Sequence, residues 1–372
     1  MRDYCSFKLE GERLRTEHCD TNNTGCKTSK SHCELQQENA IWNVSHFVNS
    51  LVAKQNKNYG SDNYFCFLLS LSAFFVGVGF LLLVCCSERN VFAGDIRRLT
   101  DDGQLKFAPV FTNKGKAIVY SVHHHPQRVV LMRLNVSDGT GDLVLPNGMA
   151  SQFDPDYSHD GRYLCYSRSG FGRQLSLVIV DTSLHTEFAF DPPGTSRSTT
   201  RTPRFLPNSD RIIFTLNGTR GQQIASVNLQ GQDPQHLTES GGINAWPAVS
   251  PDGKRVVFSS SRDGAFNLYL MDVDGHNVLR LTNSPTSDIH ASWSPSGKHI
   301  AFTSLRDRNY EIYVLQADGT NLKRVTQHPE RDDFAVWHPD GKHLLTVAER
   351  KGKFDLYLSR LEEALTSGGN SQ

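Results

Sequence analysis

The sequence lacks an excess of charge of either sign, because its 372 residues include 39 lysines and arginines and 39 aspartates and glutamates. Proteins that bind nucleic acid usually carry a basic surplus that neutralises phosphate groups. The charge balance therefore argues against DNA or RNA as a partner. The hydrophobic fraction of 38% is enough for one large core.

Signatures of several enzyme classes are also missing. The sequence contains no G-x-S-x-G nucleophile elbow, no H-E-x-x-H zinc motif and no G-x-x-x-x-G-K-[ST] phosphate loop. We therefore expect a protein that is not an enzyme and that needs no cofactor.

Cysteine is scarce in most of the chain, since Cys165 is the only cysteine after residue 86. It stands in an apolar run and is interpreted as a small buried hydrophobic residue. Four further cysteines, Cys5, Cys19, Cys26 and Cys33, belong to the polar segment 1–63. Their spacing contains no C-x-x-C pair, so we expect no metal site there. Segment 1–63 shows no apolar periodicity and is interpreted as disordered or as not belonging to the mature protein.

One long hydrophobic run is present, at residues 64–86 (YFCFLLSLSAFFVGVGFLLLVCC), and it carries no charge. As a helix it would extend about 34 Å, enough to cross a hydrocarbon layer of roughly 30 Å. The run predicts a transmembrane anchor or an export signal. Its end, Leu82-Leu83-Val84-Cys85, resembles a bacterial lipoprotein box, which leaves lipidation of Cys85 as a further hypothesis. Each alternative places the remainder of the chain in a compartment outside the cytoplasm.

The rest of the chain is repetitive. The stretch PAVSPDGKRVVFS recurs with variations in six copies, which begin at Pro109, Pro155, Pro203, Pro247, Ala291 and Ala335. A period of about 40 to 45 residues with several short apolar runs is typical of a propeller blade. The sequence therefore predicts an all-β fold, a six-bladed β-propeller over residues 92–361, followed by a flexible tail at 362–372.

The two ends of the repeat region complement each other. Residues 96–100 (IRRLT) match the outer strands that contain Arg280-Leu281-Thr282 and Arg324-Val325-Thr326, but they precede the first copy. The last copy stops after its third strand, at 354–361. We expect the N-terminal strand to complete the last blade, which would close the ring and leave no open sheet edge.

The repeat pattern [PA]-x-aromatic-S-P-D-G-[KR]-x-aliphatic-x-F-[ST], followed by I-Y-x-x-x-x-D-G and R-[LV]-T, resembles the TolB-like propeller repeat family. The resemblance covers about residues 95–361. Residues 1–94 do not resemble the α/β domain that precedes the propeller in TolB. The resemblance implies a monomeric, non-catalytic propeller of the cell envelope, periplasmic or membrane-anchored. The implied partner is a protein or peptide, of the envelope lipoprotein type.

The function of a propeller is expected at the mouth of its channel, where the inner strands of all blades begin. Counting back from each copy gives candidate ligand contacts there, namely Trp246, His290, Asn244, Asp288, Asp332 and Arg201. The alternative is that the carboxylates cap turns or pair with arginines of neighbouring blades. Arg262, Arg306 and Arg350 recur every 44 residues and are interpreted as inter-blade hydrogen-bond donors or solvated side chains.

Two other functions remain open at this point. Asp288, His290 and Asp332 could form a channel-centred hydrolase or lyase acting on glycans or peptides. The chain could also be a structural envelope component without a ligand. The run His123-His124-His125 is interpreted as a solvated loop and not as a metal site, because consecutive residues cannot all face one ion.

Overall fold

The computed structural model describes residues 96–361, apart from 126–127, 147, 171–173, 193–196, 209 and 240. The predicted disordered segment 1–63, the hydrophobic run 64–86 and the tail 362–372 lie outside the described residues, so they stay predictions. Within the described part, no helix has the length and apolar character needed to span a membrane.

The described residues form an all-β fold, as the repeat predicts. In these ranges, helical geometry occurs only in a single 3-10 turn, η2 (Asn113–Gly115). The strands are β1 (Ile96–Arg98), β2 (Lys106–Thr112), β3 (Ala117–His125), β4 (Arg128–Asn135), β5 (Gly141–Leu143), β6 (Gln152–Tyr157), β7 (Tyr163–Ser169), β8 (Leu175–Asp181), β9 (Thr186–Phe190), β10 (Thr199–Phe205), β11 (Arg211–Gly218), β12 (Gly221–Asn228), β13 (Gln235–His236), β14 (Asn244–Val249), β15 (Arg255–Ser260), β16 (Asn267–Asp272), β17 (Leu279–Arg280), β18 (Asp288–Trp293), β19 (His299–Ser304), β20 (Glu311–Gln316), β21 (Lys323–Arg324), β22 (Asp332–Trp337), β23 (His343–Arg350) and β24 (Lys353–Arg360).

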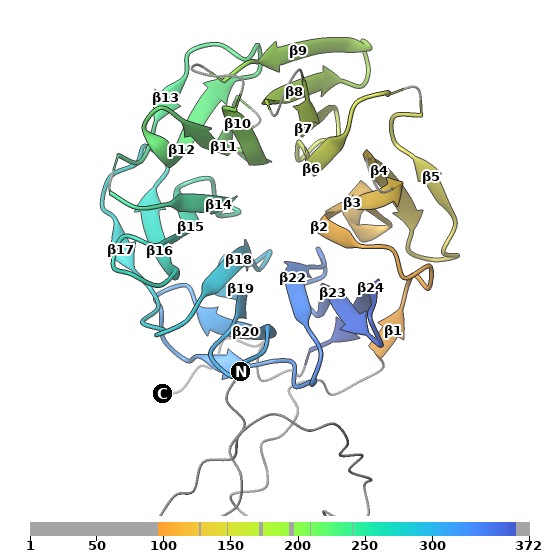
Figure 1. Ribbon diagram of the computed structural model, residues 1–372, viewed down its shortest axis with the longest axis vertical. Coiled ribbons are helices and arrows are strands. Elements are labelled where there is room, and N and C mark those ends of the chain that lie inside the picture. Colours follow the sequence, from red (N-terminus) through yellow and green to blue (C-terminus); the bar gives the residue numbers. More distant parts are fainter. Residues whose placement is uncertain are drawn as a thin grey trace, which may run out of the picture. The chain divides into compact units, whose positions relative to one another are not determined.

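The strands are arranged as a propeller, in antiparallel groups of four that follow one another around a common axis (Figure 1). Four of the sheets have four strands each, in the orders β2-β3-β4-β5, β14-β15-β16-β17, β18-β19-β20-β21 and β22-β23-β24-β1. The fifth sheet has eight strands, because the groups β6–β9 and β10–β13 are joined by one parallel pair, Thr199 with Leu175. The sequence predicts separate sheets, and the structure differs at this join. Its physical cause is local: Thr200 Oγ1 also donates to the Leu175 carbonyl, at 3.1 Å.

The predicted closure by the N-terminal strand is confirmed. Strand β1 pairs antiparallel with β24, with Ile96 opposite Ser359 and Arg98 opposite Tyr357. Thr100 then donates its hydroxyl to Asp355 at 2.8 Å and accepts the backbone N–H of Leu356 at 3.0 Å. The segment before the first copy therefore completes the last sheet.

The same two hydrogen bonds recur in other sheets, which explains why R-[LV]-T marks the outer strand. Thr282 donates to Asn267 at 3.2 Å and accepts the N–H of Leu268 at 3.0 Å. Thr326 likewise bonds the side chain of Glu311. Thr100 thus uses the hydrogen bonds of an ordinary outer strand, although about 250 residues separate it from its partner.

The hydrophobic core is divided into clusters that lie between neighbouring groups of strands. Phe258 is fully buried and packs with Ile213 and Ile224 of the preceding group. One cluster joins the first and last groups, since Ile118 packs with Leu345. Burying a side chain of this size stabilises the fold by roughly 1.5–3 kcal/mol. Because each sheet buries its faces only against its neighbours, the closed ring is what completes the core.

Candidate functional site

The first strand of every repeat copy contains a β-bulge near its start. At each bulge one non-glycine residue has a left-handed φ between 48° and 55°; these residues are Ala108, Asp154, Thr202, Trp246, His290 and Phe334. The pairing with the second strand shifts its register at the same place in each copy. A bulge leaves residues out of the ladder and re-aims their side chains. Left-handed backbone at non-glycine residues costs of order 1–3 kcal/mol each, so the surrounding sheet must hold it in place.

The bulges bring three aromatic rings, from the first strands of three successive sheets, into one row. The rings of Trp246 and His290 meet edge to face, with centroids 5.0 Å apart, and His290 stacks on Phe334 with centroids 4.0 Å apart. Phe266 extends the row on the other side of Trp246, at 5.4 Å. Trp246, His290 and Phe334 are all partly exposed. The row therefore presents a partly exposed aromatic surface to the central cavity.

A buried carboxylate orients the central imidazole of this row. Asp333 lies 2.8 Å from His290 Nδ1 and also accepts the hydroxyl of Thr303 at 2.8 Å. Burial raises the pKa of Asp333, but His290 and the guanidinium of Arg331 more than offset this effect and hold that pKa below its ordinary value. The ionised Asp333 fixes the ring orientation, so Nε2 is the nitrogen of His290 that remains available to a ligand.

The row forms part of the wall of a small central cavity of about 40 Å³. Its lining residues are Ala108, Pro109, Thr202, Arg204, Trp246, Pro247, His290, Ala291 and Phe334. The cavity is narrow, with room for only a few water molecules. A larger ligand would therefore lie on the mouth and extend only a small group into the channel.

Three of the predicted contact residues do not belong to this surface. Asp288, Asn244 and Asp332 are the first residues of β18, β14 and β22, and all three are buried. Asp288 accepts two hydrogen bonds from Arg306 Nη2, at 2.9 and 3.0 Å, and one from Ser304. The carboxylate is thus occupied by a structural ion pair within its own sheet.

The other two residues follow the same pattern. Asn244 Oδ1 accepts a hydrogen bond from Arg262 Nη2 at 3.1 Å, and Asp332 lies 2.8 Å from Arg350 Nη1. Burial raises the pKa of Asp332, and Arg350 offsets part of that effect. The recurring arginines therefore bond to the first strand of their own sheet, which corrects the interpretation that they reach neighbouring blades or only solvent. Their guanidinium groups also lie over aromatic rings, as Arg306 does over Tyr313 at 4.6 Å.

Arg201 forms a different pair. Its guanidinium bonds the buried carboxylate of Asp154 and lies over the ring of Phe153, 5.3 Å from the centroid. Burial raises the pKa of Asp154, but Arg201 offsets the effect, so that the pKa is lowered overall. About 39% of the Arg201 side chain remains exposed. Arg201 could therefore contact a ligand only while its guanidinium stays paired with Asp154.

The structure adds Phe334, Arg204 and Asp333 to the candidate residues. Phe334 occupies the same repeat position as Trp246 and His290, and this equivalence is a signal that the sequence already contained. Asp333 follows Asp332 directly, and no feature of the sequence shows which of the two faces His290. Side chains along a regular strand point alternately to its two faces, but the bulge interrupts this alternation, so the orientation of Asp333 cannot be predicted from it.

Two remaining predictions concern residues away from this surface. Cys165 is fully buried, as expected, and burial raises the pKa of its thiol well above the ordinary value. The histidines 123–125 are exposed, as expected, but they continue β3 and do not form a loop.

Comparisons with known proteins agree with this architecture. The family described as the TolB beta propeller domain matches residues 122–265 and 194–371, which together are more than half of the chain. Many solved structures are similar in fold, and three of them illustrate the range. A protein assigned as a TolB from Agrobacterium tumefaciens is 20% identical, with a TM-score of 0.56 over 72% of this chain and 94% of that one.

The gluconolactonase XC5397 from Xanthomonas campestris is 15% identical, with a TM-score of 0.55 over 74% of this chain and 93% of that one. An oligogalacturonate lyase in complex with manganese is 18% identical, with a TM-score of 0.52 over 72% and 80% of the two chains. A search of curated proteins found no match. At these identities the structures show the fold alone. The family match covers more than half of the chain, and it shows that the chain belongs to the TolB β-propeller domain family.

Proposed function

We propose that this chain is a six-bladed propeller that binds a peptide or a partner protein at its channel mouth and catalyses no reaction. The count of six blades treats each of the four four-stranded sheets as one blade and the eight-stranded sheet as two. Its halves β6–β9 and β10–β13 each contain one repeat copy and one left-handed bulge, at Asp154 and Thr202. One parallel residue pair joins them, whereas the strands within each half share ladders of up to eight pairs.

The observation that carries the proposed binding is the row of Trp246, His290 and Phe334. Aromatic side chains that are partly exposed and held rigid are enriched among the residues that dominate protein interfaces. The bulges and the Asp333 contact hold this row before any partner arrives, which lowers the entropy cost of binding. A peptide side chain could then occupy the narrow channel while the backbone lies across the rings.

The same geometry supports a non-catalytic role. His290 and Arg204 are the titratable side chains among the residues that line the cavity in the described structure. A glycan or peptide hydrolase commonly uses one group that donates a proton and another that accepts one, each within hydrogen-bond reach of the substrate. The nearby carboxylates are engaged in ion pairs. Asp288 pairs with Arg306 and Asp332 with Arg350. Asp333 pairs with both His290 and Arg331. Folds related to this one carry enzymes, including the lyase determined with manganese, so the assay below includes turnover.

We also propose a location in the cell envelope, exported or membrane-anchored. The support is the uncharged run at 64–86 and membership of the TolB propeller family. N-terminal sequencing of the mature protein together with membrane fractionation tests this placement. A mature chain that begins at Met1 and fractionates with the cytosol would contradict it.

Peptide selection tests the proposed binding. A phage-displayed random peptide library is selected against the full chain, and the selected peptides are titrated by fluorescence anisotropy. We expect Trp246→Ala to weaken binding by at least about tenfold, because truncating a central aromatic anchor typically costs about 2 kcal/mol or more. The matched control is Phe188→Ala on the outer strand β9, which is 38% exposed and should leave the affinity unchanged.

Equal binding by the wild type and Trp246→Ala would overturn the placement of the site. Turnover of oligogalacturonides or peptides by the purified chain, lost in His290→Ala, would overturn the non-catalytic role.

A further inference from the structure

The hairpin between β22 and β23 differs from the equivalent hairpins in its polar residues. Its sequence is H-P-D-G-K-H, from His338 to His343, where the fourth copy has S-P-D-G-K-R and the fifth has S-P-S-G-K-H. Of the six copies in the sequence, only this one combines histidine at the first and sixth positions with aspartate at the third. Imidazole and carboxylate are the groups that bind transition metals in proteins.

The fold of the hairpin brings the side chains of the first and third positions together in other copies that have the same turn. In the fourth copy the Ser250 hydroxyl donates to the carboxylate of Asp252 at 2.5 Å. In the last copy an imidazole replaces that hydroxyl. The turn itself is fixed by Gly341, whose φ is 68°, and by Asp340 Oδ1, which accepts the N–H of Lys342 at 2.7 Å.

The three side chains lie close together, and His338 Nδ1 also accepts the backbone N–H of Asp340 at 3.2 Å. Asp340 Oδ1 lies 3.1 Å from His338 Nδ1, and Asp340 Oδ2 lies 2.7 Å from His343 Nδ1. The ligand atoms of all three residues lie within 4.8 Å of one another. Zinc binds nitrogen and oxygen at about 2.0–2.2 Å, so neighbouring ligand atoms in a tetrahedral site are about 3.4 Å apart. Small side-chain rotations would give that spacing.

A neighbouring sheet holds one of the two imidazoles in place. The ring of His338 meets Phe111 edge to face, with centroids 4.8 Å apart. Gly115 leaves the room that the ring occupies, since a Cβ there would overlap His338 Nε2. These two contacts come from residues outside the hairpin, so they are independent evidence that the imidazole is positioned and not freely rotating.

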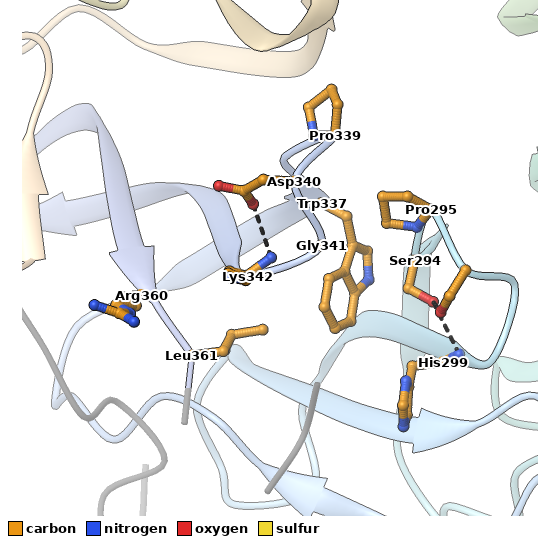
Figure 2. A pocket seen from close by; sticks show the side chains of 11 residues that line it. Ser294, Pro295, His299, Trp337, Pro339, Asp340, Gly341, Lys342, Arg360 and Leu361 are labelled. Carbon is orange, nitrogen blue, oxygen red and sulfur yellow. Dashed lines mark hydrogen bonds between the residues drawn. The ribbon is translucent and has the colours of Figure 1, made fainter. Parts of the chain in front are cut away.

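The cluster is also accessible. The exposed fractions of the His338, Asp340 and His343 side chains are 20%, 35% and 32%. Asp340 borders a pocket of about 520 Å³, and Figure 2 shows it near Trp337 and Lys342 in the pocket wall. A fourth ligand, water or a small molecule, could reach an ion from this side.

We propose that His338, Asp340 and His343 bind a divalent transition-metal ion of the zinc class. Two imidazoles and one carboxylate are three protein ligands, which leaves one tetrahedral position open. The cluster follows Trp337, the last residue of β22, whereas Asp332 is the first residue of that strand. The cluster is therefore distinct from the proposed channel-mouth site. The sequence predicts no metal site: the N-terminal cysteines and the run at 123–125 are both interpreted as sites without metal, and the hairpin is not among the candidates considered.

Cobalt titration of the full chain tests the proposal. Co²⁺ bound by nitrogen and oxygen ligands shows visible d–d bands, whereas binding to the N-terminal cysteines adds thiolate charge-transfer bands. We expect the wild type to bind one equivalent without such charge-transfer bands. His338→Ser and His343→Arg should each weaken this equivalent by at least about tenfold, the loss typical of a metal-ligand environment that has been altered. Both changes introduce residues that stand at these positions in the fourth copy, so folding should be retained.

Two control variants separate this site from adventitious binding. His276→Ser removes an exposed imidazole 3.2 Å from Asp274. Within the described part of the chain this pair belongs to no cluster of three metal-binding side chains, so the change should have no effect. Replacement of histidines 123–125 by alanine should likewise leave the equivalent in place. As a second readout, Zn²⁺ should raise the Tm of the wild type but not of His338→Ser. Equal cobalt affinity in the wild type and both hairpin variants, or no bound equivalent in the wild type, would overturn the proposal.

Discussion

Removal of the Asp355 carboxylate should open the ring at its closure. This carboxylate accepts hydrogen bonds from Arg98 at 2.7 Å, Thr100 at 2.8 Å and the N–H of Gly103 at 3.3 Å. It also lies 3.4 Å from the ammonium of Lys106, whose side chain is completely buried. Burial raises the pKa of Asp355, but Arg98 and Thr100 more than offset the effect and lower it overall, so the group is ionised at neutral pH.

The expected cost of Asp355→Ala is large because the change leaves a buried cation without one of its counter-ions. Breaking a buried ion pair from one side costs about 3–5 kcal/mol. Lys106 keeps its second partner, Asp102, which is 44% exposed, so the lower end of that range applies. For a domain of this size, 1 kcal/mol shifts the Tm by about 2–4 °C, which gives a decrease of about 6–12 °C.

Thermal and urea unfolding of the full chain, followed by circular dichroism, measure the effect. The matched control is Asn267→Ala, at the same repeat position in another sheet, where the side chain bonds Thr282 and Ser284 but no buried lysine. We expect the control to lose clearly less stability. Adding Lys106→Met to Asp355→Ala should restore part of the loss, since it removes the unpaired charge. Equal losses in Asp355→Ala and Asn267→Ala, with no rescue by Lys106→Met, would refute this reasoning.

Three further predictions follow from individual contacts. The pKa of Asp333 is lowered in the folded state, so its ionised form stabilises the fold at pH values above its unfolded pKa of about 3.9, and this stabilisation is lost as the pH falls further. In urea titrations, Asp333→Asn should make the unfolding free energy fall less between about pH 4 and pH 2. The same fall in the variant and the wild type would contradict the pairing with His290. Arg306→Ala leaves the buried Asp288 unpaired and should lower the unfolding free energy by about 3 kcal/mol in urea; a loss under about 1 kcal/mol would show that the pair is not structural. Gly275→Ala places a Cβ 2.5 Å from the backbone oxygen of Leu237 at a φ of 91° and should cost at least about 1 kcal/mol; an unchanged Tm would count against this close approach.

The repeat made most of the fold predictable. Its period indicated the strands and turns, and the match between residues 96–100 and the other outer strands indicated the closure, because the same threonine hydrogen bonds stabilise all of them. The join between β8 and β10 could not be predicted. It depends on how closely two neighbouring sheets approach at Leu175, and no residue pattern encodes this distance.

The candidate site was predictable only in part. Trp246 and His290 lie together as expected, but the left-handed bulges that place them contain no glycine to signal them. Asp288 could have been recognised as structural, because Arg306 follows it by 18 residues, and Asp332 and Arg350 share this spacing. The pairing of Asp333 with His290 depends on the distance between two sheets and has no signal in the sequence.

Hydrogen-exchange mass spectrometry of the full chain, with and without a saturating selected peptide, most directly tests whether the channel mouth is the binding surface. We predict slower exchange in bound protein at residues 244–247, 288–291 and 332–335, where the aromatic row lies. Protection confined to the outer strands, or to the hairpins at the other end of the inner strands, would contradict it.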